Sequence, residues 1–451
     1  MNMINVRRLT VMTFLGAGML SGISAQVSPL QVDTLKETKI PDQWDLQSCI
    51  DYAKEQNITI RKNRITAAST QIDVKTAKAA LFPSLSFSTG HQVVNRPYQE
   101  TSSRVSGSEI ISSNSKTSYN GNYGLNASWT LYNGNKRLKT IQQEKLNNQM
   151  AELDVATSEN NIQESIAQVY IQILYAAESV KVNENTLQVS IAQRDRGQEL
   201  LNAGSIAKSD LAQLEAQVST DRYQLVTAQA TLEDYKLQLK QLLELDGENE
   251  MNIYLPALSD ENVLAPLPTK RDVYISALSL RPEIEASKLN VEASELGINI
   301  AKSSYFPTIS LSAGIGTNHT SGSDFTFGEQ VKNGWNNSIG LSVSVPIFNN
   351  RQTKSAVQKA KLQYETSMLS LLDEQKALYK TIESLWLDAN SAQQRYAAAN
   401  EKLKSTQISY ELISEQFNLG MKNTVELLTE KNNLLQAQQE QLQAKYMAIL
   451  N

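Results

Sequence analysis

Apolar and polar side chains alternate along the stretch YNGNYGLNASWTLYNGN, residues 119 to 135. Tyr, Leu, Ala and Trp take odd positions, and Asn, Ser and Thr take most of the even ones. A period of two residues predicts a β-strand with one apolar and one polar face. The same phase recurs elsewhere, so strands are predicted at about 84–94, 119–132, 308–317 and 336–348. The side chains expected on the apolar face are Leu85, Phe87, Tyr123, Leu125, Trp129, Leu131, Ile309, Leu311, Ile339, Leu341, Val343 and Ile347.

A different pattern follows each pair of predicted strands. Residues 135 to 200 are rich in Ala, Gln, Glu, Leu and Lys and contain no proline, which favours a helix. At 1.5 Å per residue such a helix would be ~100 Å long. After Gly204, heptad spacing of apolar residues with one break at Asp221 predicts a second helix that returns along the first. Residues 350–418 and 423–450 repeat this pattern, so two antiparallel coiled-coil hairpins are predicted.

The chain contains two copies of one sequence unit, and repeats of this kind decide how the whole fold is read. Three segments recur in the same order: AKAALFPSLSFSTG as AKSSYFPTISLSAG (77–90 and 301–314), GLNASWTLYN as GLSVSVPIFN (124–133 and 340–349), and ELLNAGSIAKSDL as EQFNLGMKNTVEL (199–211 and 415–427). Each copy reads helix, strand, loop, strand, long helix, turn, helix. The opening helices are expected over 46–80 and 270–304, each ending before a proline.

The first residues have the features of a secretory signal peptide. Arg7 and Arg8 precede the apolar run LTVMTFLGAGML, and Ala25 stands at a plausible cleavage point. An acidic, proline-containing stretch separates the two copies. The expected domain organisation is therefore a signal peptide at 1–25, an N-terminal extension at 26–45, a first repeat at 46–247, a connector at 248–269 and a second repeat at 270–451.

The predicted strands favour insertion into a membrane as a closed sheet. No segment after the signal peptide approaches the ~20 apolar residues of a spanning helix, and the helices are too long and polar to cover such a sheet. Strands of about ten residues with alternating faces suit a transmembrane barrel. The alternative from one strand alone is a soluble sheet packed on helices. Four strands are too few to close a barrel, so several chains are required, and spacing alone allows a dimer, trimer or tetramer.

Composition excludes several other functions. Only 41% of the 451 residues are hydrophobic and the net charge is −5, which offers nothing to nucleic acid. Cys49 is the single cysteine and reads as a small apolar helix residue. His91 and His319 are the two histidines, with no second metal-type ligand nearby in sequence. No phosphate-binding glycine loop or catalytic constellation is present, so we expect neither an enzyme nor a cofactor.

With the duplicated AKxxxFPxxSxSxG segments, the strand pairs and the helical turns in view, nearly all of residues 42–451 resembles the TolC-like outer-membrane channel family. The resemblance implies an α+β membrane protein that forms a homotrimer, with four strands per chain in a 12-stranded β-barrel and a periplasmic coiled-coil α-barrel below. It implies a passive exit duct that exports small toxic compounds or proteins. Its expected partners are outer-membrane lipid, a periplasmic adaptor and an inner-membrane pump of the RND or ABC type.

The resemblance also assigns residues at the periplasmic tips. The turns for adaptor docking are marked by Asn202, Gly204, Asn418 and Gly420. The residues matching a periplasmic gate are Ser209, Asp210, Phe417, Lys422, Glu426, Thr429 and Glu430. Phe417 stands where relatives carry a tyrosine, which implies one missing link and a looser gate. Three copies of Glu426 would form a carboxylate ring that favours cations; a solvated helix-surface acid is the alternative.

A second function class competes with the duct. Long coiled coils after an export signal also suit a periplasmic adaptor or a structural filament without a membrane barrel. A heat-modifiable oligomer in the outer-membrane fraction would favour the duct, whereas a soluble elongated rod would favour the adaptor or filament.

Overall fold

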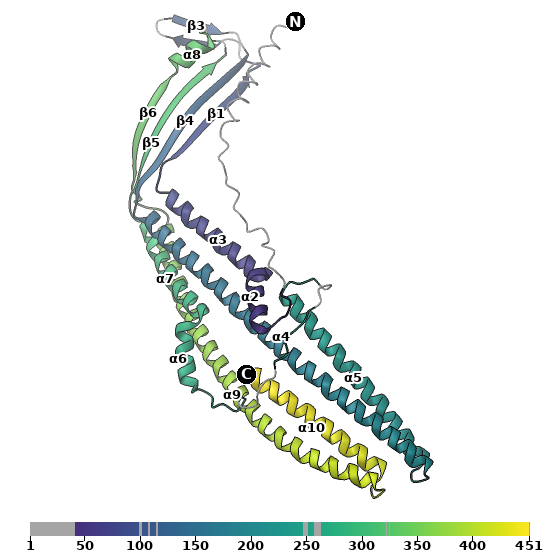
Figure 1. The fold of residues 1–451 in the computed structure, drawn as a ribbon. Coiled ribbons are helices and arrows are strands. Elements are labelled where there is room, and N and C mark those ends of the chain that lie inside the picture. The colour runs from purple at the N-terminus through teal and green to yellow at the C-terminus, as the bar shows by residue number, and fades with distance from the viewer. Residues whose placement is uncertain are drawn as a thin grey trace, which may run out of the picture.

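The computed structural model describes residues 41–98, 102–106, 109–113, 116–246, 251–256, 263–321, 323 and 325–450. The predicted signal peptide lies outside these residues, as do most of the N-terminal extension and parts of the connector. The molecule is elongated, with a four-stranded sheet at one end and two long helical hairpins at the other (Figure 1).

The four predicted strands are present and form one antiparallel sheet. Their order is β1 (Ser84–Asn95), β4 (Thr117–Asn133), β5 (Thr308–Thr320) and β6 (Asn336–Ser344). The expected end of the last strand near residue 348 is wrong, because β6 ends at Ser344, two residues before Pro346, which has no backbone N–H to donate. Strands β1 and β6 form the two edges of the sheet.

The loops between paired strands contain structure that the sequence reading did not anticipate. Strands β2 (Ser102–Ser106) and β3 (Glu109–Ser113) form a separate hairpin in the first loop. Helix α8 (Phe327–Asn333) occupies the second loop. Thr326 and Glu329 form a capping box there, in which the backbone N–H of Thr326 donates to Glu329 Oε2 at 2.8 Å. Both additions lie at the end of the sheet remote from the long helices (Figure 1).

The coiled-coil hairpins are confirmed. Helices α4 (Lys136–Asn202) and α9 (Gln352–Asn418) each have 67 residues, a length of ~100 Å at the α-helical rise. They pair with α5 (Lys208–Leu242) and α10 (Thr424–Leu450), respectively. The two copies of the unit therefore build hairpins with long helices of equal length.

Each opening helix is two helices, which corrects the expectation of single helices over 46–80 and 270–304. The pairs are α2 (Leu46–Gln56) with α3 (Ile58–Ala79), and α6 (Lys270–Leu280) with α7 (Pro282–Ser303). The breaks fall at Asn57 and Arg281, whose ψ angles of 127° and 121° are extended.

The two breaks have different chemical causes. Asn57 Oδ1 accepts from the backbone N–H groups of Thr59 and Ile60 at 2.9 and 3.4 Å, and Asn57 Nδ2 donates to Leu242 O at 3.1 Å. In the second copy Pro282 takes the first helical position, where its missing N–H costs nothing. A side-chain cap and a proline thus produce the same bend.

The junctions between sheet and long helices also match. Gly134 and Asn135 precede α4 with φ of 66° and 63°, and Asn350 and Arg351 precede α9 with φ of 51° and 63°. A Cβ on Gly134 would lie 2.6 Å from Ser303 O, so this position requires glycine on two grounds. Two left-handed residues therefore turn the chain from strand to helix in each copy.

The main core lies midway along the molecule, where α2, α4, α5 and α10 meet. It joins elements of both copies and consists of Trp44, Cys49, Ile50, Ala53, Ile166, Tyr170, Ile173, Leu174, Leu239, Leu243, Leu442 and Tyr446. Cys49 is fully buried, and burial raises the pKa of its thiol to about 12. Among the described helices, none combines the length and apolar character needed to cross a bilayer.

A matched pair of proline substitutions tests the break in the first copy. Ile58 is the first residue of α3 and is 48% exposed, whereas Ile65 lies inside α3 and is 59% exposed. Ile58→Pro should lower the free energy of unfolding by no more than about 1 kcal/mol, because proline suits the first helical turn and removes only the exposed hydrogen bond from Ile58 N–H to Glu244 Oε1 at 3.3 Å. Ile65→Pro should lower it by about 3 kcal/mol. Circular dichroism during thermal unfolding measures both, and equal losses would show that α3 does not begin at Ile58.

Candidate functional site

The strand register gathers the apolar side chains on one face of the sheet. Directly opposed residues share a face, and Phe87 opposes Leu125, which opposes Ile315 on the next strand. Ile339, at the β6 edge, is 80% exposed. No long helix covers this face (Figure 1). The sheet therefore presents an apolar surface that none of the described helices buries.

Two of the expected apolar-face positions lie outside the regular alternation. Leu131 falls at a β-bulge, after which Tyr132 instead of Leu131 opposes Ile309. Ile347 lies beyond the end of β6. The other expected positions occupy paired strand residues of one face: Leu85, Phe87, Tyr123, Leu125, Trp129, Ile309, Leu311, Ile339, Leu341 and Val343.

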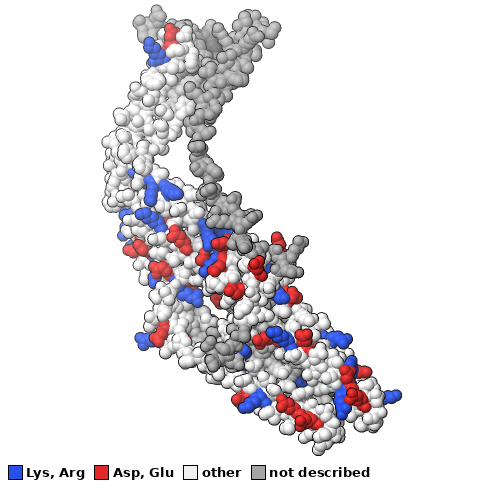
Figure 2. Space-filling view, in the orientation of Figure 1, with Lys and Arg blue, Asp and Glu red and all other residues white. Residues whose placement is uncertain are grey.

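The opposite face is polar and hydrogen-bonded across strands. Ser84 and Ser128 share a hydroxyl contact of 2.8 Å, and Asn126 Nδ2 donates to Ser88 Oγ at 3.3 Å. Ser338 Oγ donates to Gly314 O at 3.4 Å. Strands β1, β4, β5 and β6 contain no Lys, Arg, Asp or Glu, and in Figure 2 the charged side chains gather over the helices. The sheet thus offers one apolar and one polar but uncharged surface.

Aromatic residues lie at both ends of the sheet. Trp129 Nε1 donates to Leu81 O at 2.7 Å near the helices. At the loop end, His91 stacks on Tyr119 with ring centroids 5.7 Å apart, and His319 contacts Phe327 of α8 at 5.0 Å. The described residues contain no group of three or more potential metal-binding side chains. Aromatic side chains near both ends of the strands are a common feature of strands that cross a membrane.

The two hairpin tips share one turn geometry. Asn202 and Asn418 end their helices, and Gly204 and Gly420 both have a φ of 74°. The backbone N–H that follows each glycine donates back to the helix at 2.8 Å, from Ser205 to Leu200 and from Met421 to Gln416. A Cβ on either glycine would meet nothing within 4 Å, so the tips are open to solvent.

The expected gate residues all lie near these tips, but several have partners on their own hairpin. Asp210 Oδ2 accepts from the backbone N–H of Ala207 at 3.0 Å and caps α5. Lys422 Nζ lies 2.7 Å from Glu426 Oε1. This bond, with a weaker one from the backbone N–H of Asn423, lowers the pKa of Glu426. Within the described chain, Asp210 and Lys422 are therefore engaged separately.

The remaining expected gate residues differ in exposure. Phe417 is 4% exposed at the end of α9, and Ser209 is exposed at the start of α5. Thr429 Oγ1 donates to Val425 O at 2.8 Å within α10. Glu430 Oε2 accepts from Ser409 Oγ at 3.0 Å and joins α10 to α9. Phe417 thus packs in the hairpin, and Glu430 holds its two helices together.

One buried polar cluster was not predicted from the sequence. Lys431 is only 3% exposed and contacts Asp221 and Ser190, on α5 and α4. Burial lowers the pKa of Lys431, and the hydrogen bond to Asp221 opposes that shift. Asp221 had appeared only as a break in a heptad pattern. The available signal was that Lys431 occupies the buried stripe of α10 between Leu427 and Leu435.

The chain repeats a unit of two strands and a long coiled-coil hairpin, and its sheet has one apolar and one polar face. These features define the class of outer-membrane channels with a helical extension. The model of the family described as outer membrane efflux protein matches residues 49–244 and 273–449. The chain belongs to this family, which confirms the resemblance drawn from its motifs. It is accordingly an outer-membrane protein whose helical part extends into the periplasm.

Similar curated proteins have low sequence identity. Outer membrane efflux protein BepC of Brucella suis is 24% identical over 294 residues, covering 65% of this chain and 61% of the relative. Outer membrane protein TolC of Escherichia coli K12 is 24% identical over 294 residues, covering 63% and 58%. Toxin and drug export protein A of Aggregatibacter actinomycetemcomitans is 22% identical, covering 92% and 87%. The match thus spans about 60% of the first two relatives.

Solved structures show the same fold. The CusC structure has a TM-score of 0.75 at 19% identity, covering 90% of this chain and 89% of that chain. VceC of Vibrio cholerae has a TM-score of 0.73 at 15% identity, covering 89% and 93%. At such identities the likeness establishes the fold and leaves activity to be argued from the residues.

Spin labels on neighbouring residues test the two faces of the sheet. In protein reconstituted into liposomes, labels at Leu125 and Leu341 should be accessible to oxygen and shielded from a water-soluble relaxation agent. Labels at Asn126 and Ser342 should show the reverse, because adjacent strand residues point to opposite faces. Water-exposed labels at Leu125 and Leu341 would contradict the assignment of the apolar face to lipid.

Proposed function

We propose that the chain assembles as a homotrimer into a passive exit duct across the outer membrane and periplasm. In this proposal it serves a tripartite efflux or type I secretion system, exports small toxic compounds or proteins, and is gated at the helix tips. The observation that carries the proposal is the uncharged sheet with an uncovered apolar face and two open edges, continuous with two ~100 Å hairpins.

The open edges require pairing with other chains. In hydrocarbon an unpaired backbone N–H or C=O costs several kcal/mol, so only a closed sheet spans a membrane. Four strands cannot enclose a channel. Channels of this family are trimeric, and three copies supply 12 strands, with β6 of one copy beside β1 of the next. The polar face then lines the interior, and the hairpins continue the wall as a helical tube.

The proposed partners follow from the chemistry that the chain lacks. The sequence contains no nucleotide-binding loop, so an inner-membrane pump of the RND or ABC type supplies energy. A periplasmic adaptor docks at the exposed tips marked by Asn202, Gly204, Asn418 and Gly420. Named functions of relatives range from toxin and drug export to cation efflux. This spread supports a duct whose pump selects the cargo.

The gate is assigned to the tip residues that the motif match indicated. In a trimer, three Glu426 carboxylates near the tip form a ring with a negative potential, which attracts cations. Lys422 donates to this carboxylate and lowers its pKa within one chain, which favours the charged form that the ring requires. Ser209, Asp210, Phe417, Thr429 and Glu430 complete the proposed gate.

Cysteine cross-linking tests the trimer. One cysteine replaces Ser86 on the β1 edge, and a second scans the even positions of β6 from Ser338 to Ser342. At least one pair should yield covalent dimers and trimers, and nothing larger, on denaturing gels. In the control, cysteines replace Asn126 and Gly314, which are opposed within one chain and should yield only monomers. Purification as a soluble rod without interchain products would instead favour the adaptor or filament.

Planar-bilayer recording tests the carboxylate ring. Glu426→Gln should reduce cation preference, measured as the reversal potential in a salt gradient. In the wild-type channel this preference should persist to a pH below the usual range of glutamate and disappear as the pH falls through the lowered pKa. Lys422→Met should move that loss to higher pH. The control is Glu374→Gln, an exposed position far from the tip along α9. An unchanged reversal potential in Glu426→Gln would exclude the ring.

A further inference from the structure

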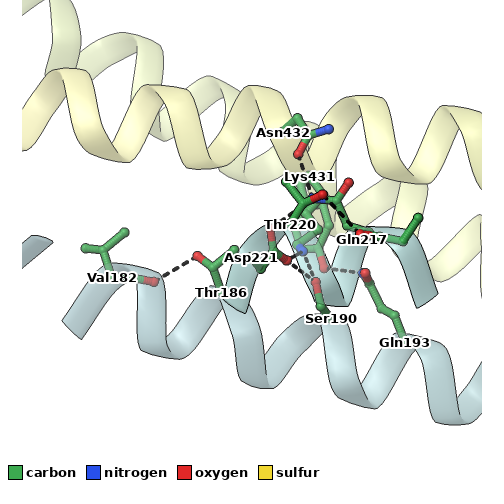
Figure 3. Close-up of polar contacts among 11 residues, drawn as sticks. Val182, Thr186, Ser190, Gln193, Gln217, Thr220, Asp221, Lys431 and Asn432 are labelled. Atoms are coloured by element: carbon green, nitrogen blue, oxygen red, sulfur yellow. Dashed lines mark hydrogen bonds and ion pairs between the residues drawn. The ribbon is translucent and has the colours of Figure 1, made fainter. Parts of the chain in front are cut away.

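Three polar side chains meet in a buried layer between the two hairpins (Figure 3). Ser190 of α4, Asp221 of α5 and Lys431 of α10 are 2%, 1% and 3% exposed. Lys431 Nζ donates to Asp221 Oδ2 and to Ser190 Oγ, and Ser190 Oγ donates to the same carboxylate oxygen. The cluster therefore connects α4 and α5 of the first hairpin to α10 of the second.

Neighbouring polar contacts extend this layer. Gln217 Nε2 donates to Asp221 Oδ1 at 2.9 Å and to Asn432 Oδ1 at 3.3 Å. Gln193 Nε2 donates to Tyr410 at 2.8 Å, which ties α4 to α9. Both carboxylate oxygens of Asp221 are thus engaged. The apolar residues above and below the cluster on its three helices include Leu187, Leu214, Val218, Leu427 and Leu435.

The buried charges favour two states, with the hairpins packed together or fully apart. They disfavour intermediate states in which α10 is partly displaced. When the hairpins are together, the ammonium and the carboxylate neutralise each other without water. When they are fully apart, water hydrates both charges. A small slide of α10 would separate the ammonium from the carboxylate while both stay buried, which is strongly unfavourable. A purely apolar layer would tolerate such sliding much better, since leucines have no directional partner.

The cluster has no counterpart at the corresponding positions of the other copy. The tip glycines Gly204 and Gly420 align the two hairpins. In that alignment Ala437, which is fully buried, takes the position of Asp221. Glu215, which is exposed, takes the position of Lys431. Each chain therefore contributes one such cluster, and it lies between its own two hairpins.

We propose that Ser190, Asp221 and Lys431 form an inter-hairpin latch. The latch sets the register of α10 against α4 and α5 and makes separation of the two hairpins a two-state step. Its relevance to transport rests on the proposed function, in which movement of the hairpins opens the periplasmic end of the duct. The latch lies within one chain and is testable without transport.

Distance measurements between spin labels test the latch directly. Labels at Ala203 and Leu419, one on each exposed tip, should give a single narrow distance distribution in trimers diluted with unlabelled chain. Lys431→Met and Asp221→Asn each leave one buried charge unpaired and should raise the population with displaced tips by at least about tenfold. The double variant Asp221→Leu/Lys431→Met removes both charges. It should have a smaller effect than the sum of the single variants, because no charge is left unpaired.

Two controls distinguish loss of the latch from a general loss of stability. Ile60→Ala removes a fully buried side chain from α3, which packs on α4 within the first copy, and should lower thermal stability without broadening the tip distances. Cysteines replacing Gln217 and Asn432, joined by a short bifunctional maleimide, should restore the narrow distribution in Lys431→Met. Unchanged distances in both single variants, or equal broadening in Ile60→Ala, would overturn the latch.

Conductance separates failure of the latch from failure of the duct. If the duct proposal holds, Lys431→Met should raise single-channel conductance, and the cross-link should reverse the rise. Displaced tips in a protein that forms no pores would retain the latch and reject the duct. Pores whose tip distances are insensitive to Lys431→Met and Asp221→Asn would retain the duct and reject the latch.

Discussion

Backbone hydrogen bonding at the edges of the sheet is the constraint on which the rest of the molecule depends. Strands β4 and β5 are paired on both sides, whereas β1 and β6 are each paired on one. In water an open edge is tolerable, but inside a bilayer every unpaired N–H and C=O must find a protein partner. Insertion of the sheet into a membrane therefore requires that several chains assemble. The apolar face and the absence of charge in the four strands have a function only in that setting.

Duplication meets the same geometric needs with different residues. The break in the opening helices comes from a side-chain cap at Asn57 in one copy and from Pro282 in the other. The strand-to-helix junctions use Gly134 with Asn135 in one copy and Asn350 with Arg351 in the other. The backbone path was retained while its local causes diverged, because any residue pair that supplies the required φ and ψ serves equally well.

Polar contacts differ in character along the hairpins. Near the tips, Asp210 and the Lys422–Glu426 pair are open to water, which screens them and keeps them easily exchanged. Nearer the core, Lys431 and Asp221 are sealed from solvent between three helices. The exposed contacts suit a surface whose side chains change partners when another protein binds. The buried pair defines which residues of the two hairpins face each other and resists gradual slippage.

The sequence by itself determined the elements whose causes are local or periodic. Period-two alternation located the four strands, composition and heptads located the hairpins, and the repeated motifs indicated the family. The sequence carries local signals for the breaks at Asn57 and Arg281, a capping asparagine and Pro282, but not the bond from Asn57 Nδ2 to Leu242 O that ties the first break to the end of α5. It could not show the bulge at Leu131, which depends on the pairing of β4 with β5. The Lys431–Asp221 contact was equally hidden, since each residue marks a polar position in an apolar stripe but nothing in the sequence pairs one with the other. Only the packing of α10 against α4 and α5 removes both from water.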